Sequence, residues 1–550
     1  MINLIFESIF FLLASCTIIL SVAGYGNFLI YKYNNNFFEK IFFGIIIITF
    51  LVTLIHFFFK ISFYITVGLL FIGLILFLRN HKSSLTKLYK SNLLYLIIFL
   101  ILLPIYISQK YHEDFGYYHL PYVITMIEEK IIFGLANSNS AYAHNSIWLN
   151  TISLFFLPKN NFNFLTLPSY LIYNLFIIFS LKNILKLNNQ KISNYFLIIC
   201  VFYLLLKFTR ISEYGNDLPA TIFSILSIFY FLRYSETKKN QNKFFYFFCC
   251  FSFAVFSVLI KLSGIPILLL PLILLLKNYE KLKKEIFNVN YLFVFLLAFI
   301  FYLQQFFYTS CIIFPTKFTC INTEWFNNDF LLLRENLELI NKSYYGSDNL
   351  LTKENYLSKL NWFSFWLERN YPEILENILT IFLPILLLIF FLPKEKNKSS
   401  LFLENKSLFI LFIFLSFIYW FKFSPVYRFS IPYFLSLFFI LSLNFYLNKG
   451  FSKKIFLYLI ISALFFNFSK NVLRIHNKNF IFFGIEKIQN QFYIDHSSDN
   501  NFIQIYNPDI KNSNNGWQGR LCWNIPFFCS YEKIRVNKNY GYLFFSKLNN

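Results

Sequence analysis

The segment YHEDFGYYHLPYV, from Tyr111 to Val123, places two carboxylates and two imidazoles side by side in a chain that is poor in acids. It follows directly on SNLLYLIIFLILLPIYIS, an apolar run long enough to cross a bilayer. A carboxylate in such a place can accept a proton from a reacting hydroxyl group. Glu113 and Asp114 are adjacent, and adjacent side chains point in different directions. We therefore expect one of them to face a site and the other to support it or to face water.

The residues after this acidic pair predict a turn, a helix and a polar loop. Gly116 permits a tight turn and Pro121 suits the first turn of a helix. The stretch YVITMIEEKIIFG has apolar residues near helical spacing, which predicts an amphipathic helix along the membrane surface. GLANSNSAYAHNSIWLN then forms a polar loop. The candidate substrate contacts of these stretches are Tyr118, His119, His144, Asn145 and Trp148. An interfacial aromatic belt would explain the tyrosines and the tryptophan, but not the acidic pair.

A second acidic turn, RISEYGNDLPA, links two later apolar runs. Its candidates are Arg210 for a phosphate group, and Glu213 and Asp217 for a substrate. Asp217 stands just before LPA, which also suits a helix N-cap followed by proline. The capping role and the site role are compatible.

Two basic residues interrupt apolar sequence. Lys261 lies in FSVLIKLSGIPILLL, and Arg428 lies in WFKFSPVYRFSIPYF. Charges near membrane depth are costly, so they are candidates for function. The planar fork of an arginine suits phosphate. The alternative for both residues is that the side chain extends to the lipid headgroups.

Carboxylates and cations at the ends of separate helices suit a reaction on a sugar carried by a lipid phosphate. A carboxylate would take the proton of the attacking hydroxyl group, and the cations would stabilise the departing phosphate. Asp114, Glu113 and His119 could also hold Mg²⁺ or Mn²⁺, and the sequence leaves this open. No glycine pattern typical of a nucleotide-binding loop is present.

Composition places these residues in a polytopic membrane protein. The 550 residues are 57% hydrophobic and 23% aromatic, and the mean hydropathy is +0.53. Successive apolar runs have the length that spanning helices require. We expect about fourteen spans, near residues 4–30, 41–59, 62–78, 93–109, 165–181, 192–208, 217–232, 244–260, 263–276, 289–306, 373–392, 407–422, 426–446 and 455–470.

The net charge of +22 does not indicate nucleic acid binding, because lysines and arginines cluster in alternate short links between the apolar runs. Cytoplasmic loops carry such an excess. An even number of spans then puts both termini outside, together with three long segments, 110–164, 307–372 and 471–550. We expect a multi-pass protein of the bacterial cytoplasmic membrane.

Two close cysteine pairs lie in these outward segments, Cys311 with Cys320 and Cys522 with Cys529. An oxidising compartment would join each pair as a local disulfide, although free thiols are the alternative. The polar tail 471–550, with short β-like runs, predicts a small extracytoplasmic α/β cap anchored by the last span.

At HEDFGYYHLP, RISEYGNDLPA and SPVYRF the chain resembles integral-membrane glycosyltransferases of the GT-C fold. Within that superfamily it is similar to a group of uncharacterised bacterial membrane proteins with related YHLP, DLPA and paired-cysteine motifs. The resemblance implies a polyprenyl-phosphate sugar donor used on the outer face with inversion. It also implies an acidic base or metal ligand at Asp114, with Glu113 as the alternative.

The resemblance also divides the chain. In GT-C enzymes the acidic loop follows the first span, whereas about three spans precede that one here. We therefore expect an N-terminal extension over 1–92, a GT-C-like core over 93–470 and the cap over 471–550.

The leading prediction is a glycosyltransferase that modifies a surface glycan, lipid or protein. An oligosaccharide polymerase or ligase is one alternative, and its sites would use outer-loop Arg and His residues. A non-catalytic transporter or flippase of lipid-linked sugars is the other, and it should carry charges near the bilayer midplane. The charges noted here gather at the ends of apolar runs instead.

Overall fold

A computed structural model describes most of the chain. The described residues are 2–30, 36–80, 93–108, 114–155, 162–185, 191–208, 211, 215–237, 240–286, 288–344, 351–391, 405–447, 452–477, 494–496, 505–507, 521–522 and 528–547.

Fourteen apolar helical segments occur in these residues, as the sequence predicts. Ten are long enough to cross a membrane, and four are shorter. The long ones lie in α1 (Ile2–Ile30), α2 (Phe37–His56), α9 (Leu167–Leu185), α11 (Asp217–Glu236), α12 (Asn240–Ile260), α15 (Val289–Thr309), α18 (Phe363–Phe391), α19 (Lys406–Phe423), α20 (Tyr427–Leu447) and α21 (Lys453–His476). The shorter ones comprise α3 (Phe63–Asn80), α5 and α6 (Leu93–Ile101, Leu103–Ile107), α10 (Ile192–Lys207), and η5 with α13 (Leu262–Leu268, Leu269–Lys277).

Short helices occupy the links between these segments. They are η1 (Phe115–His119), α7 (Leu120–Glu128), η2 (Leu135–Asn137), η3 (Ser140–Ala143), α8 (Ile147–Ser153), η4 (Phe162–Thr166), α14 (Tyr279–Ile286), η6 (Lys317–Thr319), α16 (Phe330–Asn341), α17 (Lys353–Leu357) and η8 (Ser358–Leu360). Pro121 lies in the first turn of α7, as predicted. Nearly all apolar residues of α7 are buried against protein, so this helix is part of the packed structure.

Helix α18 begins ten residues earlier than the span predicted from residue 373. Its 29 residues correspond to a length of about 43 Å at 1.5 Å per residue. The hydrocarbon core of a bilayer is about 30 Å thick, so the helix is longer than an upright span requires. The charged residues Glu368 and Arg369 lie in the ten residues by which the helix exceeds the predicted span. Hydropathy alone does not identify this part as helical.

Helices α1 and α3 are held together by close backbone approach. A Cβ atom on Gly24 of α1 would lie 2.0 Å from the carbonyl oxygen of Gly73 on α3. Small residues allow such approach where helices pack inside a membrane. Helix α2 also packs on α8, where the hydroxyl groups of Thr49 and Thr151 lie 2.6 Å apart.

The bundle is centred on α11, which is buried along its whole length and packs against α9, α10, α12 and α20. Described residues beside three of the lysine-rich links meet near the C-terminal end of α11. Arg233 donates to the side chain of Asn194 at 2.7 Å, and Asn405, which accepts from Lys277 at 2.6 Å, donates to Ser235 at 2.9 Å. The N-terminal end of α11 therefore lies at the opposite end of the bundle.

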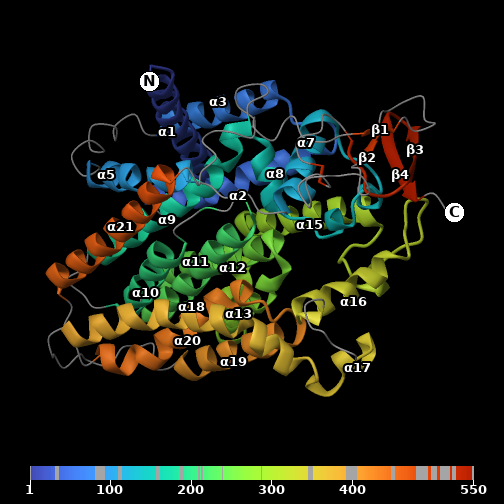
Figure 1. Cartoon of the computed structure of the whole chain (residues 1–550). Helices are drawn as coiled ribbons and strands as arrows, with labels where there is room; N and C mark the ends of the chain where they lie inside the picture. The colour runs from blue at the N-terminus through green and yellow to red at the C-terminus, as the bar shows by residue number, and fades with distance from the viewer. Residues whose placement is uncertain are drawn as a thin grey trace.

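The three segments predicted to face outward pack together. The backbone N–H of Gly134 donates to Phe307 at 2.7 Å, and the side-chain amide of Asn137 donates to the carbonyl of Trp325 at 2.9 Å. The N–H of Phe545 donates to Phe133 at 2.8 Å. Figure 1 shows α7, α16, α17 and the strands gathered at one end of the molecule.

The described C-terminal residues form two small antiparallel sheets, as a folded cap requires. Strands β1 (Ile494–His496) and β2 (Ile505–Asn507) pair, and β3 (Ile534–Asn539) pairs with β4 (Tyr542–Lys547) across the turn at Tyr540 and Gly541. The two predicted disulfides are confirmed, Cys311–Cys320 and Cys522–Cys529. The second precedes Tyr531, whose N–H donates to the carbonyl of Ser138 at 2.9 Å.

Candidate active site

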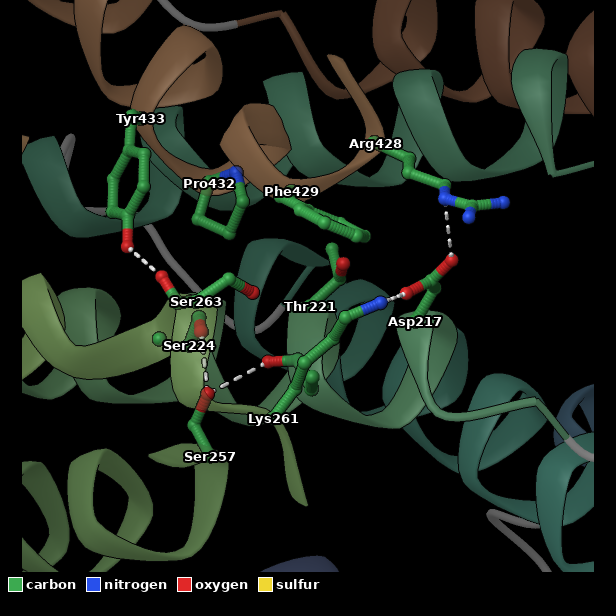
Figure 2. A pocket seen from close by; sticks show the side chains of 12 residues that line it. Asp217, Thr221, Ser224, Ser257, Lys261, Ser263, Arg428, Phe429, Pro432 and Tyr433 are labelled. Atoms are coloured by element: carbon green, nitrogen blue, oxygen red, sulfur yellow. Dashed lines mark hydrogen bonds and ion pairs between the residues drawn. The ribbon is translucent and has the colours of Figure 1, made fainter. Parts of the chain in front are cut away.

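One carboxylate joins two cations from distant parts of the chain. The Oδ1 atom of Asp217 forms an ion pair with the ammonium of Lys261, and its Oδ2 atom lies 3.3 Å from Nε of Arg428. Figure 2 shows the two cations approaching the carboxylate from different helices. The residues lie at the first turn of α11, just after α12, and at the first turn of α20. This arrangement brings together three residues that the sequence singled out separately.

The local sequence explains why Asp217 is available for these pairs. Helix α11 begins at Asp217 itself, and Asn216 occupies the N-cap position. The alternative that Asp217 is the N-cap residue is therefore wrong. An acid in the first turn is still favoured by the helix dipole. Pro219 fits this turn because the first N–H groups of a helix have no partner within it.

The surroundings of Lys261 have opposing effects on the pKa of its ammonium. Burial lowers the pKa of its ammonium below the ordinary value, while the carboxylates of Asp217 and Asp114 favour the charged form. Its Nζ atom also lies 3.7 Å from the centre of the Phe429 ring, within range of a cation–π contact. These contacts keep an ammonium at the end of α12 with about a quarter of its side chain exposed.

The first acidic segment belongs to the same neighbourhood. Asp114 acts electrostatically on Lys261, and His119 acts on Asp217. Asp114 precedes the π-helical turn η1, which ends at His119. The segment after the fourth apolar run and the helix ends of α11, α12 and α20 thus meet in one charged region.

A pocket opens between these helix ends. Its empty space, counted with its mouth, is about 280 Å³. Beyond the three charged residues, it is lined by Ala220, Thr221, Ser224, Ser257, Ser263, Gly264, Phe429, Pro432 and Tyr433. The pocket is therefore cationic at one side, rich in hydroxyl groups at another, and closed by aromatic and proline side chains (Figure 2).

Two tryptophans hold the turn that precedes Arg428. The indole N–H of Trp366 donates to the carbonyl of Pro425 at 2.7 Å, and that of Trp420 donates to Val426 at 2.8 Å. Both rings are buried and meet edge to face. Neither tryptophan stands out in the sequence. Each lies in an aromatic stretch of a helix, where a tryptophan ordinarily packs against its neighbours or belongs to the aromatic belt at the membrane interface.

The remaining predicted contacts have different positions. Tyr118 is partly exposed and packs against the ring of His119. His144 is exposed and meets Phe314 edge to face, and the amide of Asn145 donates to Gln304 at 3.1 Å. Trp148 is fully buried in α8, so it is a core residue rather than a substrate contact.

Three predicted site residues, Glu113, Arg210 and Glu213, lie outside the described residues. Within the described residues, no group of three or more His, Cys, Asp or Glu side chains could hold a metal ion. Glu113, one of the three residues that could hold a metal, is not among the residues to which this statement applies.

The fold and the site define a polytopic membrane protein with a charged pocket at one end of its helix bundle. The chain belongs to the family described as Domain of unknown function (DUF8201), whose model matches residues 8–435. Asp114, Asp217, Lys261 and Arg428 all fall within that match.

Two other comparisons add little. No curated protein matches the sequence. The cryo-EM structure of the arabinosyltransferase EmbB from Mycobacterium smegmatis is similar over 77% of this chain and 45% of that chain, with 9% identity and a TM-score of 0.31. The chain thus spans less than half of EmbB, and a likeness of this size carries no argument about activity.

Proposed function

We propose that the protein is a GT-C-like membrane glycosyltransferase. It would transfer a sugar from a polyprenyl-phosphate donor to a surface glycan, lipid or protein at the outer face of the cytoplasmic membrane. The observation that supports this most is the convergence of Asp114, Asp217, Lys261 and Arg428 on one region at the end of the bundle. The helices beside the pocket are long and apolar enough to cross a membrane, so a lipid tail could lie in the bilayer next to them.

The charges of the pocket suit a phosphate group. Lys261 and Arg428 supply two positive charges and Asp217 one negative charge, so these three side chains carry a net charge of +1. The guanidinium of Arg428 retains donors beyond the Nε atom that pairs with Asp217. A cation held in place before the reaction stabilises charge that develops in the transition state.

In the proposed step, the acceptor hydroxyl oxygen forms a bond to the anomeric carbon while the bond from that carbon to the phosphate oxygen breaks. The electron pair of the broken bond stays on the phosphate, where Lys261 and Arg428 stabilise it. The proton of the acceptor passes to a carboxylate, which we assign to Asp114, with Glu113 as the alternative. The sugar inverts because the attack comes from the face opposite the phosphate.

The position of the charges argues against a transporter. Transporters carry substrate sites near the bilayer midplane, on interrupted helices. Here the described ion pairs of the pocket are at the first turns of α11 and α20 and at the end of α12. This location favours chemistry at a surface.

The function is tested with the full chain in lipid nanodiscs and a panel of farnesyl-phosphate sugars. Wild-type protein should release farnesyl phosphate when an acceptor glycan is present. Asp114→Asn should stop release while the protein still inserts and accumulates. Asp329→Asn, which removes a carboxylate from an ion pair with Lys547 in the outer segments, is the matched control and should retain activity. Release at the wild-type rate by Asp114→Asn and Glu113→Gln alike would refute the proposed base.

A further inference from the structure

The hydroxyl groups that line the pocket differ in whether they already donate a hydrogen bond to the protein. The Oγ atom of Ser257 donates to the carbonyl of Ala220 at 3.0 Å. Ser224 and Ser257 share a hydrogen bond of 2.7 Å, and the proton of Ser257 is committed, so Ser224 must be the donor. The hydroxyl of Tyr433 donates to the carbonyl of Ser263 at 2.9 Å. Three of the five hydroxyl protons in the pocket are therefore bound to protein acceptors.

The other two belong to Thr221 and Ser263. Neither side chain has a hydrogen bond to any residue that the structure describes, and in a helix a threonine ordinarily bonds to the carbonyl four residues earlier. Thr221 is buried, one turn beyond Asp217 on α11. Ser263 follows Lys261 by two residues in η5. Figure 2 shows both hydroxyl groups directed into the space beside Lys261 and Phe429.

Hydroxyl groups that face a pocket and have no partner among the described residues can donate to a ligand that accepts hydrogen bonds. Two hydroxyl donors stand here beside two cations. Donors of both kinds suit the oxygens of a phosphate, which accepts hydrogen bonds and donates none in its ionised diester form.

The pocket opens to solvent, and its space of about 280 Å³ includes that mouth. A phosphate group that meets the two hydroxyl groups would leave the sugar at the mouth.

We propose that Thr221 and Ser263 donate hydrogen bonds to the phosphate of the lipid donor and complete the anion pocket of Lys261 and Arg428. This inference rests on the proposed function. It adds two uncharged residues that determine affinity for the phosphate and that no motif in the sequence reveals.

The test compares the binding of farnesyl phosphate with that of farnesol to the full chain in nanodiscs. Thr221→Val keeps the shape of the side chain and removes the donor, and Ser263→Ala removes the other donor. Each should weaken binding of farnesyl phosphate about tenfold, because a hydrogen bond to a charged group is lost. Binding of farnesol should not change. Thr221→Ser keeps the hydroxyl group and should retain affinity.

Ser224→Ala is the matched control, since it deletes a hydroxyl group of the same pocket whose proton is committed to Ser257. Its affinity for farnesyl phosphate should equal that of wild type. If Thr221→Val and Ser263→Ala bind farnesyl phosphate as wild type does, the inference is wrong and the proposed function stands. If wild type itself does not prefer farnesyl phosphate over farnesol, the phosphate pocket of the proposed function is wrong as well.

Discussion

Asp217 and Arg428 lie 211 positions apart in the chain, yet the Oδ2 atom of one is 3.3 Å from the Nε atom of the other. The contact joins the first turn of α11 to the first turn of α20. The second oxygen of the same carboxylate binds Lys261 at the end of α12. Asp217 is therefore the common counter-ion of the two cations in the pocket.

Asp217→Asn should destabilise the protein, because it leaves Lys261 and Arg428 without their common partner. Breaking a buried ion pair costs about 3–5 kcal/mol, whereas exposed pairs contribute about 0–1 kcal/mol. Arg428 is nearly half exposed and Lys261 about one quarter, so we expect a loss of about 1–3 kcal/mol, mostly through Lys261. Thermal unfolding in detergent measures this as a lower Tm.

The control for this variant is Asp329→Asn, which breaks an ion pair with Lys547 whose two side chains are 55% and 40% exposed. Its Tm should remain close to that of wild type. Sulfate should restore part of the stability of Asp217→Asn and none to the control, because an added anion can take the place of the carboxylate. An equal loss in both variants would contradict the role of Asp217.

Binding of farnesyl phosphate should fall at alkaline pH. The pKa of Lys261 is lowered from 10.5 by burial and by Arg428, although Asp217 and Asp114 oppose this. The pocket is cationic below the folded pKa and loses the charge of Lys261 as the pH rises through it. The affinity should therefore decrease with a midpoint below pH 10.5. Lys261→Arg should move this decrease to higher pH, since arginine stays protonated. An unchanged profile in Lys261→Arg would exclude Lys261 as the titrating group.

The turn before Arg428 should depend on two indole N–H groups. Trp366→Phe and Trp420→Phe keep the rings in the aromatic cluster and remove the hydrogen bonds to Pro425 and Val426. Each bond contributes about 1 kcal/mol, so each variant should bind farnesyl phosphate about fivefold more weakly, with farnesol binding unchanged.

Trp362→Phe provides the control for these variants. Trp362 is buried in the same cluster, and it has no hydrogen bond to residues 424–426 in the part of the chain that the structure describes. Its loss should lower Tm through packing, but it should leave the ratio of phosphate to alcohol binding intact. A change in that ratio with Trp362→Phe would show that general packing of the cluster, rather than the two N–H groups, positions Arg428.

The helices were predictable because each apolar run in the sequence is about as long as the helix that it forms. All fourteen predicted segments have helical counterparts among the described residues, and the two disulfides follow from local spacing. The N-terminal part of α18 was missed because charged residues interrupt its hydropathy without interrupting its backbone hydrogen bonds. Where charged residues interrupt the apolar sequence, the sequence predicts the end of a helix less well than a long apolar run does.

The candidate site was predictable only in part. Asp217, Lys261 and Arg428 each stand out as a charge next to apolar sequence, but nothing in the sequence says that they meet. Thr221 and Ser263 are common residue types within apolar helices. They differ from Ser224 only in that the hydroxyl of Ser224 already donates a hydrogen bond to Ser257. Trp148 shows the opposite error: its aromatic, polar surroundings suggested a binding residue, whereas α8 buries it completely.

The docking of the C-terminal hairpin should affect the reaction through Gly134. This residue has a φ of +72°, and a Cβ atom there would lie 2.1 Å from the carbonyl oxygen of Phe545. The loop after Gly134 leads to Asn139, whose side-chain amide donates to the carbonyl of Tyr117 at 2.9 Å, three residues after Asp114. Gly134→Ala should therefore displace both the hairpin and the segment that carries the proposed base.

Gly541→Ala separates backbone strain from this displacement. Gly541 has a φ of +76°, but the nearest atom to an added Cβ is the flexible end of Lys130 at 3.6 Å. The left-handed conformation costs a non-glycine residue about 1–2 kcal/mol at either position. Gly134→Ala should lower Tm further than Gly541→Ala and reduce kcat for sugar transfer, while farnesyl phosphate binding by Lys261 and Arg428 is retained. Equal Tm and kcat in the two variants would show that hairpin docking does not position Asp114, because only the strain they share would then remain.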